Sequence, residues 1–212
     1  MTSRSAQRRN ASDREAIVTE QVSEKAKAAR AHRWYRVGAW AGALILIGGL
    51  VTFGLLTSRP AASSAHRPAP DFSLSTTTGT TVSLSSFRGR PVILYFNEGA
   101  GCGACSTQLA AIEKDKAAFD AAGLTVLPIV MNTRAQIQPD LDAAGVTSPV
   151  LLDDGTVSKA YDTLGKGMHE GLPGHSFVLI GPDGTQLWNG EYPSMWLDPQ
   201  KLLDEATSRL KV

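Results

Sequence analysis

Residues 91–122 read PVILYFNEGAGCGACSTQLAAIEKDKAAFDAA, and the predicted fold is built outward from them. The apolar run at 92–96 is short and rich in β-forming residues, which indicates a buried strand. A glycine-rich turn follows, and apolar residues at helical spacing then predict a helix over about 105–122, with Gly123 as its stop. The only two cysteines of the 212 residues, Cys102 and Cys105, lie where the strand passes into the helix. This placement predicts a redox-active thiol pair.

A cysteine at the start of a helix faces unpaired backbone N–H groups and the positive end of the helix dipole, and both stabilise a thiolate. We therefore expect Cys102, on the turn, to be the more exposed and more acidic sulfur, and Cys105 to close a disulfide back onto it. Attack, mixed disulfide and resolution are the steps of thiol exchange, which this spacing suits. An inert disulfide is the alternative, but so short a loop would stabilise the fold only weakly. A zinc site completed by His169 and His175 is disfavoured by the strand–turn–helix setting.

Strand and helix signals alternate along the rest of the chain. Strands are expected over 72–74, 81–84, 124–131, 150–152, 175–180 and 185–189, and helices over 134–144 (broken by Pro139), 156–164 and 199–210 (capped by Asp198). The first two strands and the last two should form hairpins, around residues 78–80 and 181–184. This order predicts an α/β sandwich.

The N-terminal region differs from the rest of the chain in charge. Residues 1–36 hold nine basic and four acidic residues, a formal charge of +5, whereas residues 70–212 carry a formal charge of −6. The uncharged run at 37–56 is about as long as a bilayer-spanning helix, and Trp34, Tyr35 and Trp40 cluster at its start. The positive-inside rule then places the N-terminus in the cytoplasm and the following domain outside. A cleaved signal peptide is the alternative, but the apolar run is longer than a signal core.

Four segments follow from this pattern. They are a basic, partly helical leader at 1–36, a transmembrane helix at 37–56, a flexible Pro/Ala/Ser-rich tether at 57–69 and a redox domain at 70–212. His66 in the tether is expected to be solvated. Acidic residues interleave with the basic residues of the leader, which disfavours a nucleic-acid-binding arm.

Several stretches of the chain resemble the redoxin family. They are PDFSL (70–74), VSLSSFRGRPVILYF (82–96), CGAC (102–105), SPVLLDD (148–154), FVLIGPDG (177–184) and GEYP (190–193). This family comprises thioredoxin-fold proteins related to membrane-anchored thiol-disulfide oxidoreductases and to the alkyl hydroperoxide reductase/thiol-specific antioxidant group. The resemblance spans about 69–212 and implies a thioredoxin-like three-layer sandwich, here preceded by one transmembrane helix.

The resemblance also implies further site residues. Many thioredoxins carry a buried acid where this chain has Tyr95, so Glu98 is the substitute candidate for proton transfer, with a solvated turn carboxylate as the alternative. Pro173 is the nearest match to the family's cis-proline. The turn before Cys102 is one residue longer than in thioredoxins, and Ala104 replaces the usual proline of the CxxC motif, so the active-site loop should be more flexible.

Histidine and aromatic side chains follow in the last third of the chain. His169 and His175 flank Pro173 and are candidates to pair with the thiolate, although a loop histidine more often faces solvent. Other residues are candidates for the rim of a substrate groove, with packing as the alternative: Trp188, Tyr192, Met195 and Trp196.

The sequence therefore predicts an extracytoplasmic thiol-disulfide oxidoreductase in which Cys102 is the nucleophile and Cys105 the resolving thiol. A thiol-dependent peroxidase is the second hypothesis. Peroxidases of this superfamily place Thr or Ser three residues before the reactive cysteine and Pro four residues earlier, where this chain has Gly99 and Tyr95. A non-enzymatic copper-delivery module is the third hypothesis. It is weakened because such modules have a CxxxC motif, whereas this chain has CxxC.

We expect no cofactor and no bound metal. The expected partners are protein thiols and disulfides, a membrane or extracytoplasmic redox partner and, through residues 37–56, the lipid bilayer; no nucleic acid is expected. The substrate and the direction of electron flow are left open by the sequence.

Overall fold

The structure is a computed structural model that describes residues 34, 36, 38–54, 61–63, 66–165 and 170–211. The chain divides into two compact units, Met1–Leu56 and Thr57–Val212. Each unit is described by itself.

In the first unit, residues 38–54 form a helix whose side chains are all exposed. Within the described residues, no helix is both long and apolar enough to cross a bilayer. The predicted span at 37–56 extends past this helix, since Val37, Leu55 and Leu56 lie outside the described residues. Residues 1–33 of the predicted leader also lie outside the described residues.

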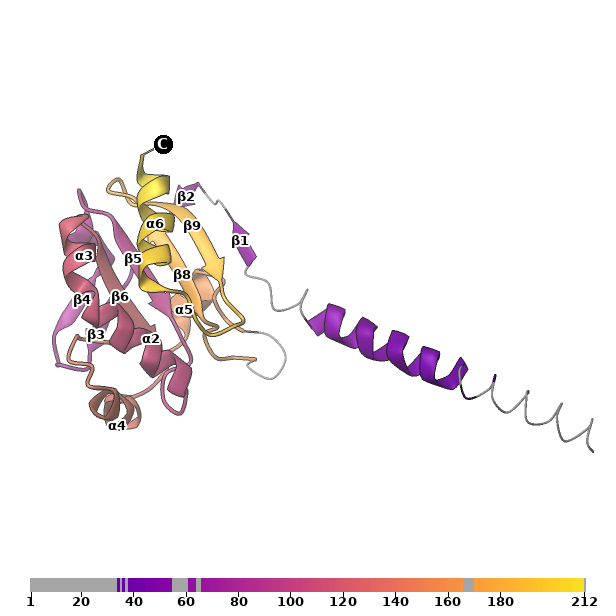
Figure 1. The fold of residues 1–212 in the computed structure, drawn as a ribbon. Coiled ribbons are helices and arrows are strands. Elements are labelled where there is room, and N and C mark those ends of the chain that lie inside the picture. The colour runs from indigo at the N-terminus through magenta and orange to yellow at the C-terminus, as the bar shows by residue number, and fades with distance from the viewer. Residues whose placement is uncertain are drawn as a thin grey trace, which may run out of the picture. The chain divides into compact units, whose positions relative to one another are not determined.

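The second unit is built on one mixed sheet (Figure 1). Within the described residues, its strands are β1 (Ala61–Ser63), β2 (Arg67–Pro68), β3 (Ser73–Thr76), β4 (Thr81–Ser83), β5 (Val92–Phe96), β6 (Thr125–Val130), β7 (Leu151–Leu152), β8 (Ser176–Ile180) and β9 (Thr185–Glu191). The strand order is β1-β9-β8-β5-β6-β7-β3-β4, with β2 also paired to β9. The central strand β5 runs parallel to β6 and antiparallel to β8, so Phe96 at its end lies beside Ser176 at the start of β8.

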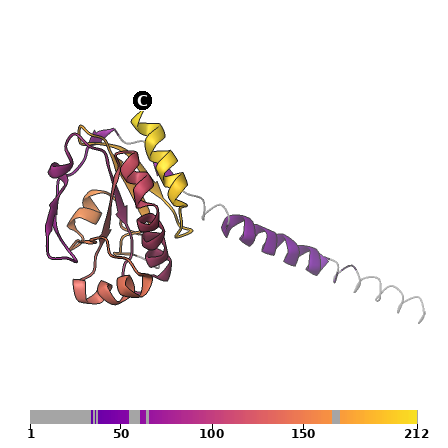
Figure 2. The ribbon, with the colours of Figure 1, turned by 60° about the vertical axis from the view of Figure 1, so that its left-hand side comes forward.

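Helices cover both faces of this sheet (Figures 1 and 2). They are α2 (Gly103–Lys114), α3 (Lys116–Ala121), α4 (Arg134–Ala144), α5 (Thr156–Ala160) and α6 (Pro199–Leu210), with a 3-10 turn η1 at Leu84–Phe87. One hydrophobic cluster joins residues of α2, α3, α4 and α6 to the sheet, and a second cluster joins η1 and α5 to the other face. The result is a three-layer α/β sandwich, as the sequence predicts.

Strand β5 shows why the sheet is two-sided. Its five residues are all buried; Ile93 and Tyr95 belong to the first cluster, while Val92, Leu94 and Phe96 belong to the second. Successive side chains of a strand point to opposite faces, so an unbroken apolar run requires cover on both. Full burial of each aliphatic or aromatic side chain stabilises the fold by about 1.5–3 kcal/mol.

Several sequence expectations agree with the structure. Strand β5 covers the predicted range, and the strand predicted over 124–131 is β6. The two predicted hairpins are present as β3–β4 and β8–β9. Helix α6 begins with Pro199, and the Asp198 side chain accepts hydrogen bonds from the backbone N–H groups of Gln200 and Lys201. His66 is exposed.

Other expectations need correction. The helix predicted over 105–122 starts earlier, at Gly103, and is divided at Asp115 into α2 and α3. The helix expected to end at Leu164 is shorter, because α5 stops at Ala160. Part of the expected flexible tether forms the short strands β1 and β2, which pair with β9.

Helix α4 continues through Pro139, so the predicted break at this proline is wrong. A proline inside a helix removes one backbone hydrogen bond, but both ends of α4 are capped. Thr133 and Gln136 form a reciprocal capping box at the start, and Gly145 closes the end with left-handed backbone. These caps stabilise the two ends of α4, and the helix continues through Pro139.

Candidate active site

Cys102 and Cys105 are joined by a disulfide at the N-terminus of α2. Cys102 is the N-cap residue, and its Sγ accepts a hydrogen bond from the backbone N–H of Cys105 at 3.2 Å. Because the helix begins at Gly103 and not at Cys105, both sulfurs lie at the positive end of the helix dipole. Backbone and dipole together favour a thiolate at Cys102 in the reduced protein.

The two sulfur-bearing residues differ in exposure. Cys105 is 1% exposed, whereas Cys102 is only half-buried. This agrees with the expectation that Cys102 is the more accessible residue. A bulky disulfide or a protein thiol therefore reaches Cys102 more easily than Cys105.

The turn between β5 and Cys102 is held by side chains from three places. The Asn97 Oδ1 accepts the N–H of Gly99 at 3.1 Å, and the Asn132 Oδ1 accepts the N–H of Ala100 at 2.9 Å. The Asp140 carboxylate, on α4, accepts the N–H of Gly101 at 2.7 Å. Three successive backbone donors thus have partners, which fixes the turn that was expected to be flexible.

Gly99 has no room for a side chain. Its φ is +76°, in the left-handed region, and a Cβ there would collide with the Asn132 side-chain oxygen. A peroxidase that used Cys102 would need a Thr or Ser hydroxyl at this position. The hydroxyl is missing from the sequence, and the Asn132 side chain occupies the space that a side chain at this position would need.

His175 precedes β8, the strand paired with β5, and so lies near the start of this turn. It is 2% exposed, so the expectation of a solvent-facing histidine is wrong. The Tyr95 hydroxyl and the His175 Nδ1 are 3.1 Å apart in a hydrogen bond, and the Tyr95 ring stacks on Phe177 at 4.5 Å between centroids. Burial lowers the pKa of His175 from 6.5 to about 4. Burial, followed by the charge of Glu98, raises the pKa of Tyr95 well above its usual value. Both groups are therefore neutral at pH 7.

Glu98 is half-buried and lines a cavity of about 180 Å³ together with His175. Gly165, Gly174, Glu191, Tyr192, Pro193 and Met195 complete its wall. The structure therefore brings Glu98 and His175 together beside the cysteine loop, while the role of Glu98 in proton transfer stays a prediction.

Pro173 is buried, and its backbone forms an isolated bridge with Leu164. No peptide bond of the described residues is cis, so Pro173, the nearest match to the family's cis-proline, is preceded by a trans peptide bond. His169 lies outside the described residues.

The aromatic candidates for a groove rim divide into two groups. Trp188 is 1% exposed and belongs to the core, and Tyr192 is also buried, so the packing interpretation holds for both. Met195 is half-buried beside the cavity, and Trp196 is 42% exposed. Only the last two are accessible enough to contact a substrate at the surface.

Asn132, Asp140 and Gln108 were not found by sequence reasoning. The Gln108 Oε1, one turn after Cys105 on α2, accepts the N–H of Leu197 at 2.8 Å and so ties the helix to the loop after β9. Asn132 follows the end of β6, the strand next to β5, and a polar residue at the carboxyl end of a neighbouring parallel strand is a usable signal. Asp140 carries no such signal, because only the tertiary contact between α4 and the turn defines it.

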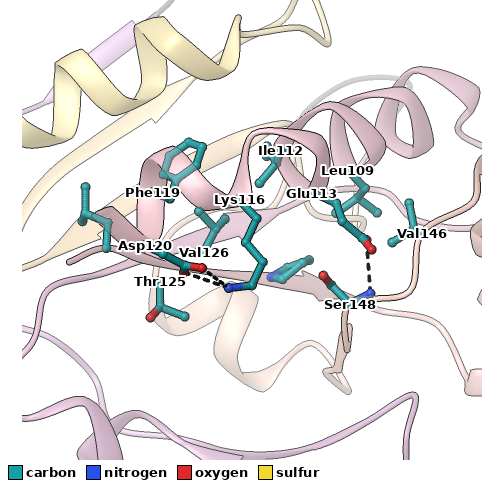
Figure 3. Close-up of a pocket in the computed structure, with 12 residues that line it drawn as sticks. Leu109, Ile112, Glu113, Lys116, Phe119, Asp120, Thr125, Val126, Val146 and Ser148 are labelled. Carbon is teal, nitrogen blue, oxygen red and sulfur yellow. Dashed lines mark hydrogen bonds and ion pairs between the residues drawn. The ribbon is translucent and has the colours of Figure 1, made fainter. Parts of the chain in front are cut away.

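A second cavity, of about 60 Å³, lies under α2 and α3 (Figure 3). Leu109, Ile112, Phe119 and Val126 give it apolar walls, and Lys116 and Asp120, which form an exposed ion pair, also line it. Neither cysteine lines it, so we do not assign it to the redox site. In the described part of the chain, no group of three or more His, Cys, Asp or Glu side chains is arranged to hold a metal ion.

Comparison with known families accounts for this arrangement. Residues 65–185, more than half of the chain, match the AhpC/TSA family. The chain belongs to that family. Its β5–turn–α2 unit, with the cysteine pair at the helix N-terminus, lies within the matched residues.

Several similar proteins of known sequence are peroxiredoxins. A candidate peroxiredoxin of Mycobacterium tuberculosis is 35% identical over 99 residues, which cover 46% of this chain and 63% of that protein. A candidate peroxiredoxin of Haemophilus influenzae is 30% identical over 128 residues, covering 58% of this chain and 82% of that protein. The chain thus spans less than two-thirds of the M. tuberculosis relative.

Solved structures support the thioredoxin-like fold. The peroxidoxin BcpB of M. tuberculosis superposes with a TM-score of 0.57 at 19% identity, covering 70% of this chain and 96% of that chain. A candidate protein disulfide isomerase of Bacteroides thetaiotaomicron superposes with a TM-score of 0.55 at 26% identity, covering 70% and 91%. The predicted α/β fold is confirmed, and the family relationship supports a thiol-based redox enzyme.

Proposed function

We propose that the domain is a thiol-disulfide oxidoreductase on the AhpC/TSA scaffold. The observation that carries the proposal is the Cys102–Cys105 disulfide at the N-terminus of α2, in which Cys102 is half-buried and Cys105 is buried. Such a pair is a two-electron carrier, because the disulfide and the dithiol interconvert without other groups.

The reaction follows from the geometry. The Cys102 thiolate attacks a sulfur of the substrate disulfide, the substrate S–S bond breaks, and the departing sulfur takes up a proton. The Cys105 thiol then loses its proton and attacks Cys102, which breaks the mixed disulfide and releases the second substrate thiol. The substrate gains two electrons and two protons, and an external dithiol returns the domain to its reduced state.

A thiol-dependent peroxidase is the second candidate, and the relatives favour it over the first because they are peroxiredoxins. In that reaction a thiolate attacks a peroxide oxygen, an alcohol or water leaves, and the resulting sulfenic acid condenses with the second thiol. Counted from Cys102, the expected hydroxyl position is Gly99, which has none. If Cys105 is the reactive cysteine, the hydroxyl position three residues before it is Cys102. A peroxidase of this kind would thus have Cys105 as its nucleophile.

Steady-state kinetics of the reduced domain separates the two candidates. We expect the rate of disulfide reduction to exceed the rate of hydroperoxide reduction by at least about tenfold, a difference of about 1.4 kcal/mol in activation free energy. Disulfide reduction should vanish in Cys102→Ser. Faster consumption of hydroperoxide than of a protein disulfide would overturn the first candidate and establish the second.

The cellular location is a separate proposal. The basic leader, the uncharged run at 37–56 and the fully exposed apolar helix at 38–54 support a membrane anchor with the redox domain outside the cytoplasm. Protease added to intact cells should then digest the domain beyond residue 67 and spare the leader. Protection of the domain until the cells are lysed would contradict this location.

A further inference from the structure

Asp140 is an acidic side chain next to the redox centre that the proposed mechanism does not use. It lies on α4, 39 positions after Gly101, and its Oδ2 accepts the backbone N–H of Gly101 at 2.7 Å. Gly101 directly precedes Cys102. The bonded N–H belongs to the residue next to Cys102, so covalent geometry keeps the Asp140 carboxylate within about 10 Å of the Cys102 Sγ.

The neighbouring hydrogen bond shows that a charge is not needed to hold the turn. Asn132 binds the N–H of Ala100 at 2.9 Å through an uncharged amide oxygen. Asp140 does the same for the next residue, but it adds a negative charge. Among the described residues no lysine or arginine forms an ion pair with Asp140, so this charge is not neutralised by a direct partner.

We propose that Asp140 is a positioning residue for Cys102 that holds the N–H of Gly101 and disfavours the Cys102 thiolate through its negative charge. This deepens the proposed function, since it rests on Cys102 being a redox-active thiol. The helix dipole and the N–H of Cys105 stabilise the thiolate, and the carboxylate opposes them. Because a destabilised thiolate makes the dithiol less stable relative to the disulfide, Asp140 makes the domain a stronger reductant.

Other charged groups lie in the same turn and on the same helix. Glu98 lies in the same turn and adds a second negative charge, while Arg134 and Asp142 lie on the same helix as Asp140. Asp142 is two positions further along α4, about 200° around the helix axis, and it is exposed. Its carboxylate accepts a hydrogen bond from Gln138. Asp142 is therefore a matched control with the same charge on the same helix.

The test is the pKa of Cys102, measured by alkylation of the reduced full-length chain against pH, with mass spectrometry assigning the label to Cys102. Asp140→Asn keeps an oxygen for the N–H of Gly101 but removes the charge. We expect the pKa to fall by a few tenths of a unit to about one unit at low ionic strength. The shift should shrink in 1 M salt, because exposed charges are screened. Asp142→Asn should leave the pKa unchanged.

The reduction potential gives a second readout. Each unit by which the pKa falls should raise the potential by about 30 mV at a pH where Cys102 is ionised in both proteins. Asp140→Ala should show the same pKa shift and, in addition, faster amide hydrogen exchange at Gly101. A pKa in Asp140→Asn equal to that of the parent, or an equal shift in Asp142→Asn, would overturn the proposal.

These measurements need no substrate, so their failure differs from failure of the proposed function. If the charge effect is found but the chain does not reduce disulfides, the role of Asp140 stands and the oxidoreductase proposal is wrong. If disulfides are reduced but Asp140→Asn leaves the pKa and potential unchanged, Asp140 only holds the turn.

Discussion

Two segments meet at the carboxyl end of β5, and they are held in place by different forces. The turn at 97–101 is glycine-rich, and side-chain oxygens of Asn97, Asn132 and Asp140 hold its backbone N–H groups. The segment at 173–175 is fixed by burial, with His175 packed against Tyr95 and Phe177. The turn reaches solvent at Gly101, which also binds the Asp140 carboxylate, whereas burial keeps His175 neutral. The chemistry of the cysteines can therefore be tuned from the turn and not from the histidine.

The largest stability effect should come from Gly99 in the clamped turn. Gly99→Ala adds a Cβ that collides with Asn132 and forces a side chain into left-handed backbone. We expect a loss of about 3 kcal/mol in the free energy of unfolding, measured by urea titration. Gly101→Ala is the matched control, because Gly101 has a similar φ of +84° but open space around it. It should lose only about 1 kcal/mol.

Equal losses in the two variants would show that the contact with Asn132 does not constrain the turn. A loss in Gly101→Ala larger than that in Gly99→Ala would contradict the described geometry of the clamp.

The buried segment should reveal itself through pH. The folded-state pKa of His175, about 4, lies below the value of 6.5 in the unfolded chain. Its contribution to stability is therefore complete above pH 6.5 and is lost as the pH falls toward 4, because the unfolded chain binds the extra proton. Between pH 7.5 and pH 5 we expect a loss of about 2 kcal/mol from this residue.

His175→Gln should remove that loss from the pH profile of the unfolding free energy. His66→Gln is the control, since His66 is exposed and should leave the profile as it is in the parent chain. A profile of His175→Gln that still falls as steeply as the parent would show that His175 is not buried in the neutral form.

Local pattern sufficed to predict much of this fold. The apolar run of β5, the Asp198–Pro199 start of α6 and the turn signals of the two hairpins each depend on residues close in sequence. Errors arose where distant contacts decide. The strands β1 and β2 form only because β9 offers an edge to pair with, and Pro139 is tolerated because both ends of α4 are capped.

The same distinction applies to the candidate site. The cysteine pair and its place at a helix start were evident from spacing, and the structure agrees. The burial of His175 was not evident, since a histidine after Pro173-Gly174 reads as a loop residue, whereas its partner Tyr95 is 80 positions away. Asp140 likewise reaches the turn from a separate helix.

The central claim is that Cys102, the accessible N-cap residue, is the nucleophile and that Cys105 is the resolving thiol. It is tested most directly by trapping mixed disulfides with protein substrates in the two single-cysteine variants, Cys105→Ser and Cys102→Ser, and counting adducts by non-reducing electrophoresis. We predict stable adducts in Cys105→Ser and almost none in Cys102→Ser, because Cys105 is only 1% exposed. Adducts that accumulate only in Cys102→Ser would contradict the account and assign the nucleophile to Cys105.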